Sequence, residues 1–183
     1  MPNWCSTTYV FKGKNGNEKG FEIFKNEMIK FLSESPNTDE GRWLGTLAKH
    51  FGFDIDNFPY GLRGWISYYE DNGDYLTVDV EDAWVYHNGI FEMILENYFP
   101  QVDYVMTAEE PGCEIYVNTD TDHEYLCDMY CLIVTDENDN WVDSVYCDSN
   151  EVLEKYKEEW KAENPNYDFI VHPFESDYGI YWN

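Results

Sequence analysis

The sequence predicts an α+β protein built on an antiparallel sheet with two helices on one side. Three observations support this prediction. In several segments apolar and polar residues alternate with a period of two, as in residues 75–81 and 114–118, which is typical of a strand with one buried face. Two other segments repeat apolar residues at helical spacing. The segments follow one another in the order strand, helix, strand, strand, helix, strand, before a C-terminal extension.

The first half of this pattern lies in residues 3–33. A strand is expected over residues 3–12, which are rich in β-branched and aromatic side chains. A helix is expected over residues 19–33, where Phe24 and Met28 belong to an apolar stripe. Residues 36–62 contain Gly and Pro and little regular pattern, so we expect an insertion with one short helix.

The second half begins with a hairpin. Residues 64–70 and 75–81 are strand-like, and the turn between them contains Asn72-Gly73, a strong hairpin signal. A helix is expected over residues 88–99, with Asn88 as its cap, and a fourth strand over residues 102–108. This order predicts a ferredoxin-like βαββαβ core.

The remaining residues, 119–183, are expected to form an appended module. Strands are expected over residues 125–135 and 141–147, around an acidic turn. A helix over residues 149–163, capped by Ser149, and a strand over residues 168–171 complete the module. We expect it to pack on the first sheet, with strands that extend that sheet or form a small second one.

Short motifs resemble a known family. The opening Met1-Pro2-Asn3-Trp4-Cys5 is similar to the start of a family of small phage and plasmid proteins with a ferredoxin-like domain, called YubB-like in plasmids. The resemblance covers residues 1–118 and includes Asp82-Ala83-Trp84, Phe99-Pro100 and Glu109-Glu110-Pro111-Gly112. The chain departs from the family at Val85-Tyr86-His87 and at Glu114-Ile115-Tyr116. The family has no established biochemical activity, so the resemblance implies a fold and a mobile-element origin.

The chain is strongly acidic, and its charge is uneven. It holds 37 Asp and Glu against 11 Lys and Arg, a net charge of −26. Residues 1–50 are nearly neutral, whereas residues 64–154 contain no Lys or Arg. Because nucleic acids and anionic membranes bind through basic residues, we expect neither direct nucleic-acid binding nor membrane binding. The counterparts left are a basic protein, a metal ion or solvent.

The sequence favours no metal or cofactor site. Residues 120–124 and 136–140 place oxygen ligands at positions 1, 3 and 5 of a calcium loop, but lack the Gly and Glu that such a loop needs at positions 6 and 12. Cys127 and Cys131 have no second ligand pair at zinc-finger spacing. We therefore interpret the two loops as acidic turns and the cysteines as core thiols.

Catalysis and export are also disfavoured. Cys5, His87, His123 and His172 supply residue types for nucleophilic catalysis, but no local signature accompanies them. The sequence shows no signal peptide and no apolar stretch of about 20 residues. Five cysteines, an odd number, favour reduced thiols and a cytoplasmic protein. Because no catalytic signature is present, we expect a protein that is not an enzyme.

The function predicted from these features is imitation of a nucleic acid. Carboxylates on a sheet lie about 7 Å apart along a strand, and neighbouring strands lie about 4.8 Å apart, so they reach a phosphate-like density. We expect the acidic face to occupy the cationic groove of a basic nucleic-acid-binding protein, such as a CRISPR or restriction nuclease. The candidate partner-binding residues are Asp74, Asp79, Glu81, Asp82, Glu109, Glu110, Glu114, Asp120 and Asp122.

Three alternatives stay open. The first is an accessory or structural protein with a solvated acidic face, and the second is a protein adapted to high salt. The third and least favoured is a metal-binding or hydrolytic enzyme.

Overall fold

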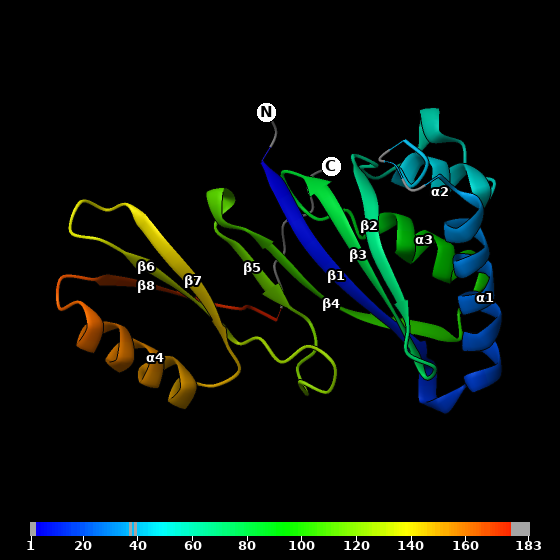
Figure 1. The fold of residues 1–183 in the computed structure, drawn as a ribbon. Coiled ribbons are helices and arrows are strands. Elements are labelled where there is room, and N and C mark those ends of the chain that lie inside the picture. Colours follow the sequence, from blue (N-terminus) through cyan, green and yellow to red (C-terminus); the bar gives the residue numbers. More distant parts are fainter. Residues whose placement is uncertain (1–2, 37, 39, 177–183) are drawn as a thin grey trace. The chain divides into compact units, whose positions relative to one another are not determined.

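The computed structural model describes residues 3–36, 38 and 40–176 (Figure 1). Within these residues the chain is mixed α and β, with four α-helices and two antiparallel sheets. It divides into two compact units, here called unit 1, up to Ile115, and unit 2, from Tyr116. The division lies close to the boundary expected after residue 118.

The predicted segments of unit 1 are helices and strands in the expected order. They are β1 (Trp4–Gly13), α1 (Glu18–Glu34), α2 (Leu44–His50), β2 (Gly64–Asp71), β3 (Tyr75–Ala83), α3 (Gly89–Tyr98) and β4 (Val102–Glu110). A further short strand, β5 (Ile115–Asn118), contains the division between the units. The first sheet has the strand order β2-β3-β1-β4-β5, and β1 pairs antiparallel with both β3 and β4.

Both long helices of unit 1 cover the same face of this sheet (Figure 1). The ring of Phe11 on β1 lies 5.0 Å from that of Phe24 on α1 and 5.3 Å from that of Phe91 on α3. Tyr9, two residues earlier on the same face, also contacts Phe91, at 4.6 Å. These aromatic contacts join one strand face to two helices and form the centre of the core of unit 1.

The alternation of apolar and polar residues in β3 buries one face of the strand, as predicted. Leu76, Val78 and Val80 are buried, and their neighbours in register on β1 are Phe11, Tyr9 and Thr7. The alternate residues of β3 are only partly buried. This parity decides which acidic side chains of the strand can reach the surface.

The insertion between α1 and β2 is packed rather than loose. Leu44 and Leu47 of α2 are fully buried. The Tyr98 hydroxyl, at the end of α3, donates a hydrogen bond of 2.7 Å to the carbonyl oxygen of Phe51. Ile66 of β2 donates a backbone hydrogen bond to the carbonyl oxygen of Arg42. The insertion is therefore attached both to α3 and to the edge of the sheet.

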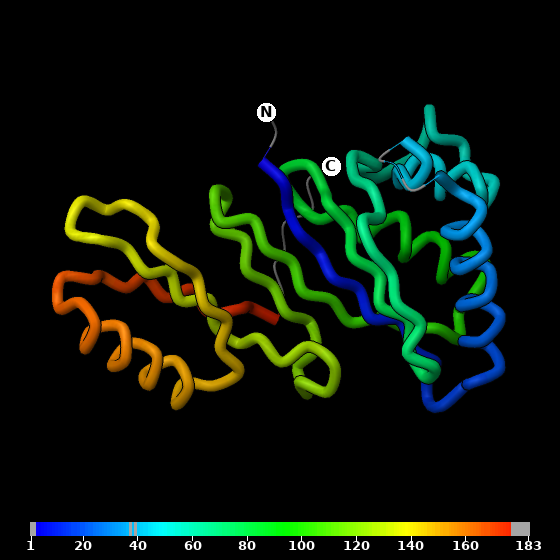
Figure 2. The backbone as a smooth tube through the Cα atoms, viewed as in Figure 1, coloured from blue at the N-terminus to red at the C-terminus, as the bar shows by residue number. Residues whose placement is uncertain are grey.

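Unit 2 contains a sheet of its own. The strands β6 (Tyr130–Thr135), β7 (Trp141–Cys147) and β8 (Asp168–Pro173) have the order β7-β6-β8, and both pairs are antiparallel. The helix α4 (Asn150–Glu163) packs on one face around Leu132, Val134, Cys147 and Leu153 (Figure 2). Of the two arrangements left open for these strands, a small second sheet is the one observed.

Three local predictions need correction. Residues 125–129 are not part of the strand, because side chains of Asn118 and Asp120 bind their backbone groups. Asn88 stands at the N-cap position of α3, but its side chain makes no capping hydrogen bond and instead donates one to Glu92. Residues 115–118 do not alternate between core and solvent, since all four are buried. The cap predicted at Ser149 is confirmed, since its hydroxyl accepts a hydrogen bond from Val152 N.

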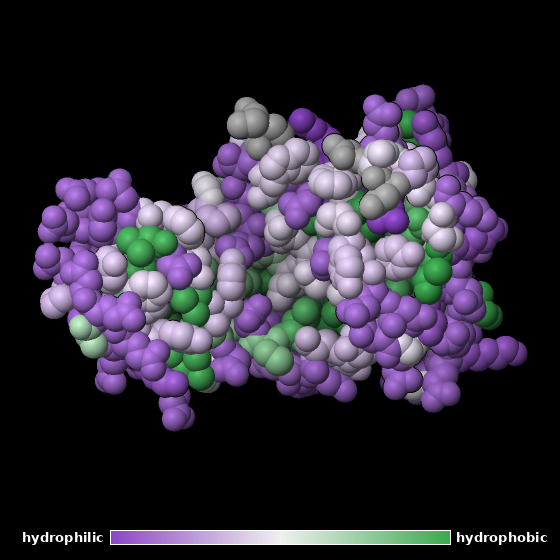
Figure 3. Space-filling model, viewed as in Figure 1, coloured by the Kyte–Doolittle hydropathy of each residue, from purple (hydrophilic) through white to green (hydrophobic). Residues whose placement is uncertain are grey.

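Hydrophilic residues cover most of the surface visible in Figure 3, and hydrophobic residues show only in small areas. Among the helices in the described part of the chain, none is long and apolar enough to cross a bilayer.

Candidate interaction surface

The face of the unit 1 sheet opposite α1 and α3, here called the outer face, gathers acidic side chains from different strands. Tyr9 and Phe11 point to the helices, so Ser6 and Thr8 point to the outer face. The register places Ser6 between Glu81 on β3 and Glu109 on β4. The next row places Thr8 beside Asp79. Three of the predicted residues, Asp79, Glu81 and Glu109, are therefore neighbours on one surface.

Hydroxyl groups of β1 hold two of these carboxylates. Ser6 Oγ donates a hydrogen bond of 3.0 Å to Glu81 Oε1, and Thr8 Oγ1 donates one of 2.8 Å to Asp79 Oδ1. Burial raises the pKa of Asp79 above its ordinary value, and the hydrogen bond from Thr8 opposes this shift in part. The carboxylates are thus fixed in direction by the sheet and its hydroxyls, rather than placed on flexible loops.

The outer face is negative as a whole. In the four strands β1 to β4 it carries five acidic residues, which are Glu70, Asp79, Glu81, Asp103 and Glu109. Lys12, opposite Tyr75 and Asp103 in the register, is the one basic residue of these strands. Two spacings between neighbouring strands separate Glu81 from Glu109, about 10 Å of backbone.

Aromatic side chains border the acidic rows. Trp65 and Tyr68 of the edge strand β2 pair in register with Glu81 and Asp79. Tyr68 is 51% exposed, and Trp4, next to Ala83 in the register, is 50% exposed. Large exposed aromatic residues are common anchors in protein interfaces. The strand register thus places Trp4, Trp65 and Tyr68 beside the acidic residues of β3.

Four predicted residues of unit 1 lie elsewhere. Asp82 and Glu110 point to the helix-covered face and are almost completely buried. Parity already separates Asp82 from Glu81, because consecutive strand residues face opposite sides. Asp74 is exposed in the turn between β2 and β3, and Glu114 is exposed after the turn that follows β4, at a φ of 57°.

The two predicted residues of unit 2 differ from each other. Asp122 is exposed in a loop. Asp120 is 3% exposed, and its Oδ2 accepts hydrogen bonds from Tyr125 N at 2.7 Å and Leu126 N at 3.0 Å. Asp120 therefore organises residues 120–126 instead of presenting a charge to a partner.

We expect Asp120→Ala to destabilise unit 2 by about 1–3 kcal/mol, because two backbone N–H groups lose their acceptor. Amide hydrogen exchange at Tyr125 and Leu126 should accelerate. Asp120→Asn keeps an acceptor oxygen and serves as the control, with a smaller loss. Equal stability of Asp120→Ala and wild type would show that these hydrogen bonds contribute nothing.

A second group of polar residues is buried under the helix-covered face, where β3, β1 and β4 lie side by side. This buried polar cluster consists of Cys5, Thr7, Tyr9, Asp82 and Glu110, together with the partly buried His87. Thr7 Oγ1 and His87 N both donate hydrogen bonds to Asp82 Oδ2, at 3.4 and 3.2 Å. In the described part of the chain, Tyr9 OH, Asp82 Oδ1, His87 Nε2 and Glu110 Oε2 have no hydrogen-bond partner.

Burial governs the protonation of this cluster. Desolvation raises the pKa of Asp82 well above its usual range, against the hydrogen bonds from His87 and Thr7. Desolvation and the nearby Asp82 raise the pKa of Cys5 to about 12, so this thiol stays protonated at neutral pH. A protonated thiol is a poor nucleophile. Desolvation also lowers the pKa of His87.

The two candidate metal loops use their carboxylates internally. Asp136 Oδ1 accepts hydrogen bonds from Asn138 N and Asn140 N, and Asp120 binds its own loop as described above. Among the described residues, no group of three or more His, Cys, Asp or Glu is arranged to hold a metal ion.

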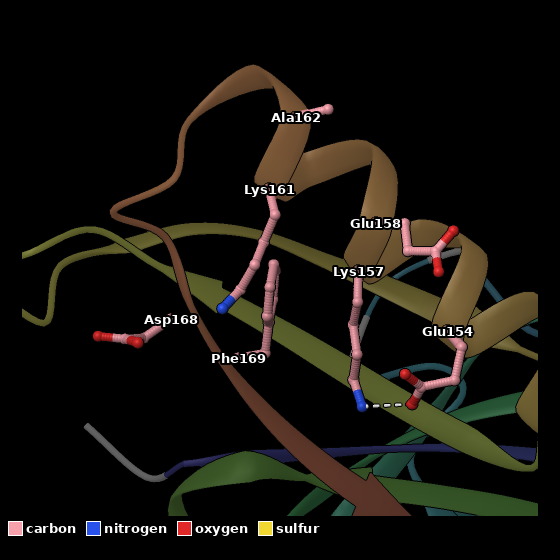
Figure 4. Close-up of a pocket in the computed structure, with 7 residues that line it drawn as sticks. All are labelled: Glu154, Lys157, Glu158, Lys161, Ala162, Asp168 and Phe169. Carbon is pink, nitrogen blue, oxygen red and sulfur yellow. Dashed lines mark hydrogen bonds and ion pairs between the residues drawn. The ribbon is translucent and has the colours of Figure 1, made fainter.

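A groove of about 740 Å³ lies between α4 and β8 in unit 2 (Figure 4). Lys157 Nζ lies 2.7 Å from Glu154 Oε1, and Lys161 Nζ lies 5.6 Å from the centre of the Phe169 ring. Glu158 and Asp168 also line the groove. Lys157 and Lys161 thus already interact with a carboxylate and an aromatic ring, so the groove offers no concentrated positive charge to a ligand.

Comparisons of the chain with protein-family models, curated proteins and solved structures found no significant match.

Proposed function

We propose that the protein imitates a nucleic acid and occupies the cationic groove of a basic nucleic-acid-binding protein. The observation that carries this proposal is the row of Glu81, Ser6 and Glu109 beside Asp79, on the rigid outer face. The proposed site is smaller than the nine residues predicted from sequence, because Asp82, Glu110 and Asp120 are buried.

Physical chemistry supports the outer face as a mimic in two ways. A sheet holds carboxylates at fixed spacings despite their mutual repulsion, which a flexible acidic chain cannot do. Partner arginines, which bind carboxylates with two hydrogen bonds and also stack on aromatic rings, match a surface where Asp79 and Glu81 adjoin Tyr68 and Trp65.

We also propose that unit 1 is a ferredoxin-like domain of the YubB-like kind, from a phage or plasmid. Its strand order β2-β3-β1-β4 and the two helices on one face support this assignment. A mobile element gains from disabling a host nuclease. We therefore propose an anti-CRISPR or antirestriction role in the cytoplasm of the host.

Two charge-matched variants test the proposal. The outer-face variant carries Asp79→Asn, Glu81→Gln and Glu109→Gln. The control variant carries Glu151→Gln, Glu158→Gln and Glu163→Gln, three exposed positions of α4. Each loses three negative charges, so any difference between them reports the location of the charge and not its amount.

Wild type and both variants are immobilised, and a bacterial lysate freed of nucleic acid is passed over each. We expect wild type and the control variant to retain the same proteins, and duplex DNA or RNA to release them at constant ionic strength. The outer-face variant should retain them at least tenfold less. Retention that is unchanged in the outer-face variant, or that nucleic acid does not reverse, contradicts the proposal and favours a solvated acidic face.

A further inference from the structure

The sheet of unit 2 has one face that α4 covers and a second face that is covered only in part. Leu132 of β6 packs against α4, so Ile133, the next residue, points to the second face. On this face the ring of Tyr116 stacks on His172 of β8, with the ring centres 4.4 Å apart. The neighbouring row, which contains Ile133, is more open, since Ile170 beside it is 50% exposed.

Large apolar side chains lie side by side on this second face. Ile133 pairs in register with Ile170 of β8 and with Ser144 of β7. The indole N–H of Trp141 donates a hydrogen bond of 2.9 Å to Ser144 Oγ, so the indole lies beside the same row. Trp141 is 66% exposed, and Tyr146, two residues after Ser144 on β7, is 45% exposed. The apolar strip, as we call it here, consists of Trp141, Ile133, Ile170 and Tyr146.

The apolar strip has the width of one helix. It crosses the three strands of the sheet, whose outer members lie about 10 Å apart, and an α-helix with its side chains is about 10–12 Å wide. The hydrogen bond to Ser144 uses the polar atom of the Trp141 indole, so this side chain offers an apolar surface to a partner. Exposed apolar side chains that adjoin one another, rather than occurring singly, mark interaction sites.

The charges around the apolar strip favour a basic occupant. Asp168 of β8 is exposed on the same face, and the turn between β6 and β7 exposes Glu137 and Asp139. A second copy of the chain, with its net charge of −26, is repelled by this border. Basic side chains that flank an apolar stripe are attracted to it. In residues 116–176 every Lys and Arg belongs to α4, which covers the other face; they are Lys155, Lys157 and Lys161.

We propose that the apolar strip binds the apolar stripe of a basic amphipathic helix from another protein. The strip buries the apolar side chains of that helix, and Lys and Arg along the edges of the helix pair with Asp168 and the acidic turn. This binding site lies in unit 2 and goes beyond the function proposed above, because it uses no carboxylate of the outer face.

Three synthetic peptides with the same helical pattern test the proposal. The first has Leu on its apolar stripe and Lys elsewhere, the second has Leu and Glu, and the third has Gln and Lys. Binding of each labelled peptide to the full-length protein is measured by fluorescence anisotropy. Two variants of the apolar strip, Ile170→Ser and Trp141→Ser, are compared with Ile23→Ser, a matched control because Ile23 of α1 is 54% exposed.

We expect wild type and Ile23→Ser to bind the Leu–Lys peptide equally well, and more tightly than either other peptide. Ile170→Ser and Trp141→Ser should each bind it about tenfold more weakly, because one large apolar side chain no longer becomes buried on binding. The Gln–Lys peptide binds through charge alone, so its affinity should be the same for all four proteins.

Equal affinity of the Leu–Lys peptide for wild type and for the strip variants would overturn the proposal. Equal binding of the Leu–Glu and Leu–Lys peptides by wild type would contradict a basic occupant. Sedimentation velocity without peptide tests the other occupant, since a wild-type dimer that Ile170→Ser dissociates would assign the strip to a second copy. Circular dichroism checks the fold of each variant, and if one strip variant is unfolded, the other decides the question.

Discussion

Phe11→Ala is expected to destabilise unit 1 by about 3–5 kcal/mol, the largest effect of any single substitution proposed for this protein. Phe11 is fully buried, and its ring contacts aromatic rings from β1, α1, α3 and β4, which are Tyr9, Phe24, Phe91 and Tyr104. Truncation to Ala leaves a cavity where the two helices meet the sheet, and the surrounding rings can collapse into it only in part.

Urea unfolding followed by circular dichroism measures this loss. Ile23→Ala is the control, because Ile23 lies on α1 but is 54% exposed, and it should change the free energy of unfolding by no more than about 0.5 kcal/mol. A Phe11→Ala protein as stable as Ile23→Ala would mean that the two helices do not share the core described above.

Asp82→Asn is expected to stabilise the protein at neutral and alkaline pH, by on the order of 1–3 kcal/mol, because folded wild type must retain a proton on Asp82 that the unfolded chain releases. Asn has nearly the same shape and keeps an acceptor for Thr7 Oγ1 and His87 N. It removes the proton equilibrium that makes Asp82 unfavourable when its surroundings become alkaline.

The sign of the pH dependence follows from the raised pKa of Asp82 in the folded protein. Below the ordinary pKa of an Asp, both the folded and the unfolded chain hold the proton, so wild type and Asp82→Asn should be similarly stable. Above it, the unfolded chain releases the proton while the folded chain retains it, and wild type loses stability until the pKa of the folded state is passed.

Urea unfolding of both proteins at pH 5, 7 and 9 tests this sign, because all other titrating groups cancel in the difference. The advantage of Asp82→Asn should grow with pH. An advantage that shrinks with rising pH would mean that Asp82 is stabilised as a carboxylate, and that its burial is compensated by groups other than those described above.

Local patterns were sufficient to predict most of the elements. The alternation in residues 75–81, the Asn72-Gly73 turn and the apolar stripes of α1 and α3 are properties of neighbouring residues, and the structure contains each of these elements. The prediction failed where side chains bind the backbone. Residues 125–129 were expected to continue the strand that follows them, but Asn118 and Asp120 bind the backbone groups that a strand would have used.

The candidate surface was predictable only in part, for a similar reason. The alternation of side chains along a strand is sufficient to place Asp79 and Glu81 on one face. The position of Glu109 beside Ser6 depends on the register between β1 and β4, which are separated by nearly one hundred residues. The burial of Glu110 and Asp82 requires knowledge of what covers the other face, and acidic residues are almost always exposed.

The contacts of the buried Lys25 could not be predicted from the sequence either. The helical pattern places Lys25 among the residues of α1, where a lysine is normally solvated. In the structure it is 6% exposed, and its Nζ contacts Glu22, Asp71 and the carbonyl oxygen of Gly73. It thus joins α1 to the hairpin of β2 and β3, a contact that no local sequence pattern predicts.

The most direct test of the proposed mimicry is a competition titration. A basic protein retained by the immobilised wild type is purified, and its binding to fluorescently labelled duplex DNA or RNA is measured as each variant is added. Wild type and the α4 control variant should displace the labelled nucleic acid competitively, and less effectively as salt rises, because salt screens the carboxylates. The outer-face variant should require at least tenfold more protein. Equal displacement by the outer-face variant and wild type would contradict the assignment of the site to Asp79, Glu81 and Glu109.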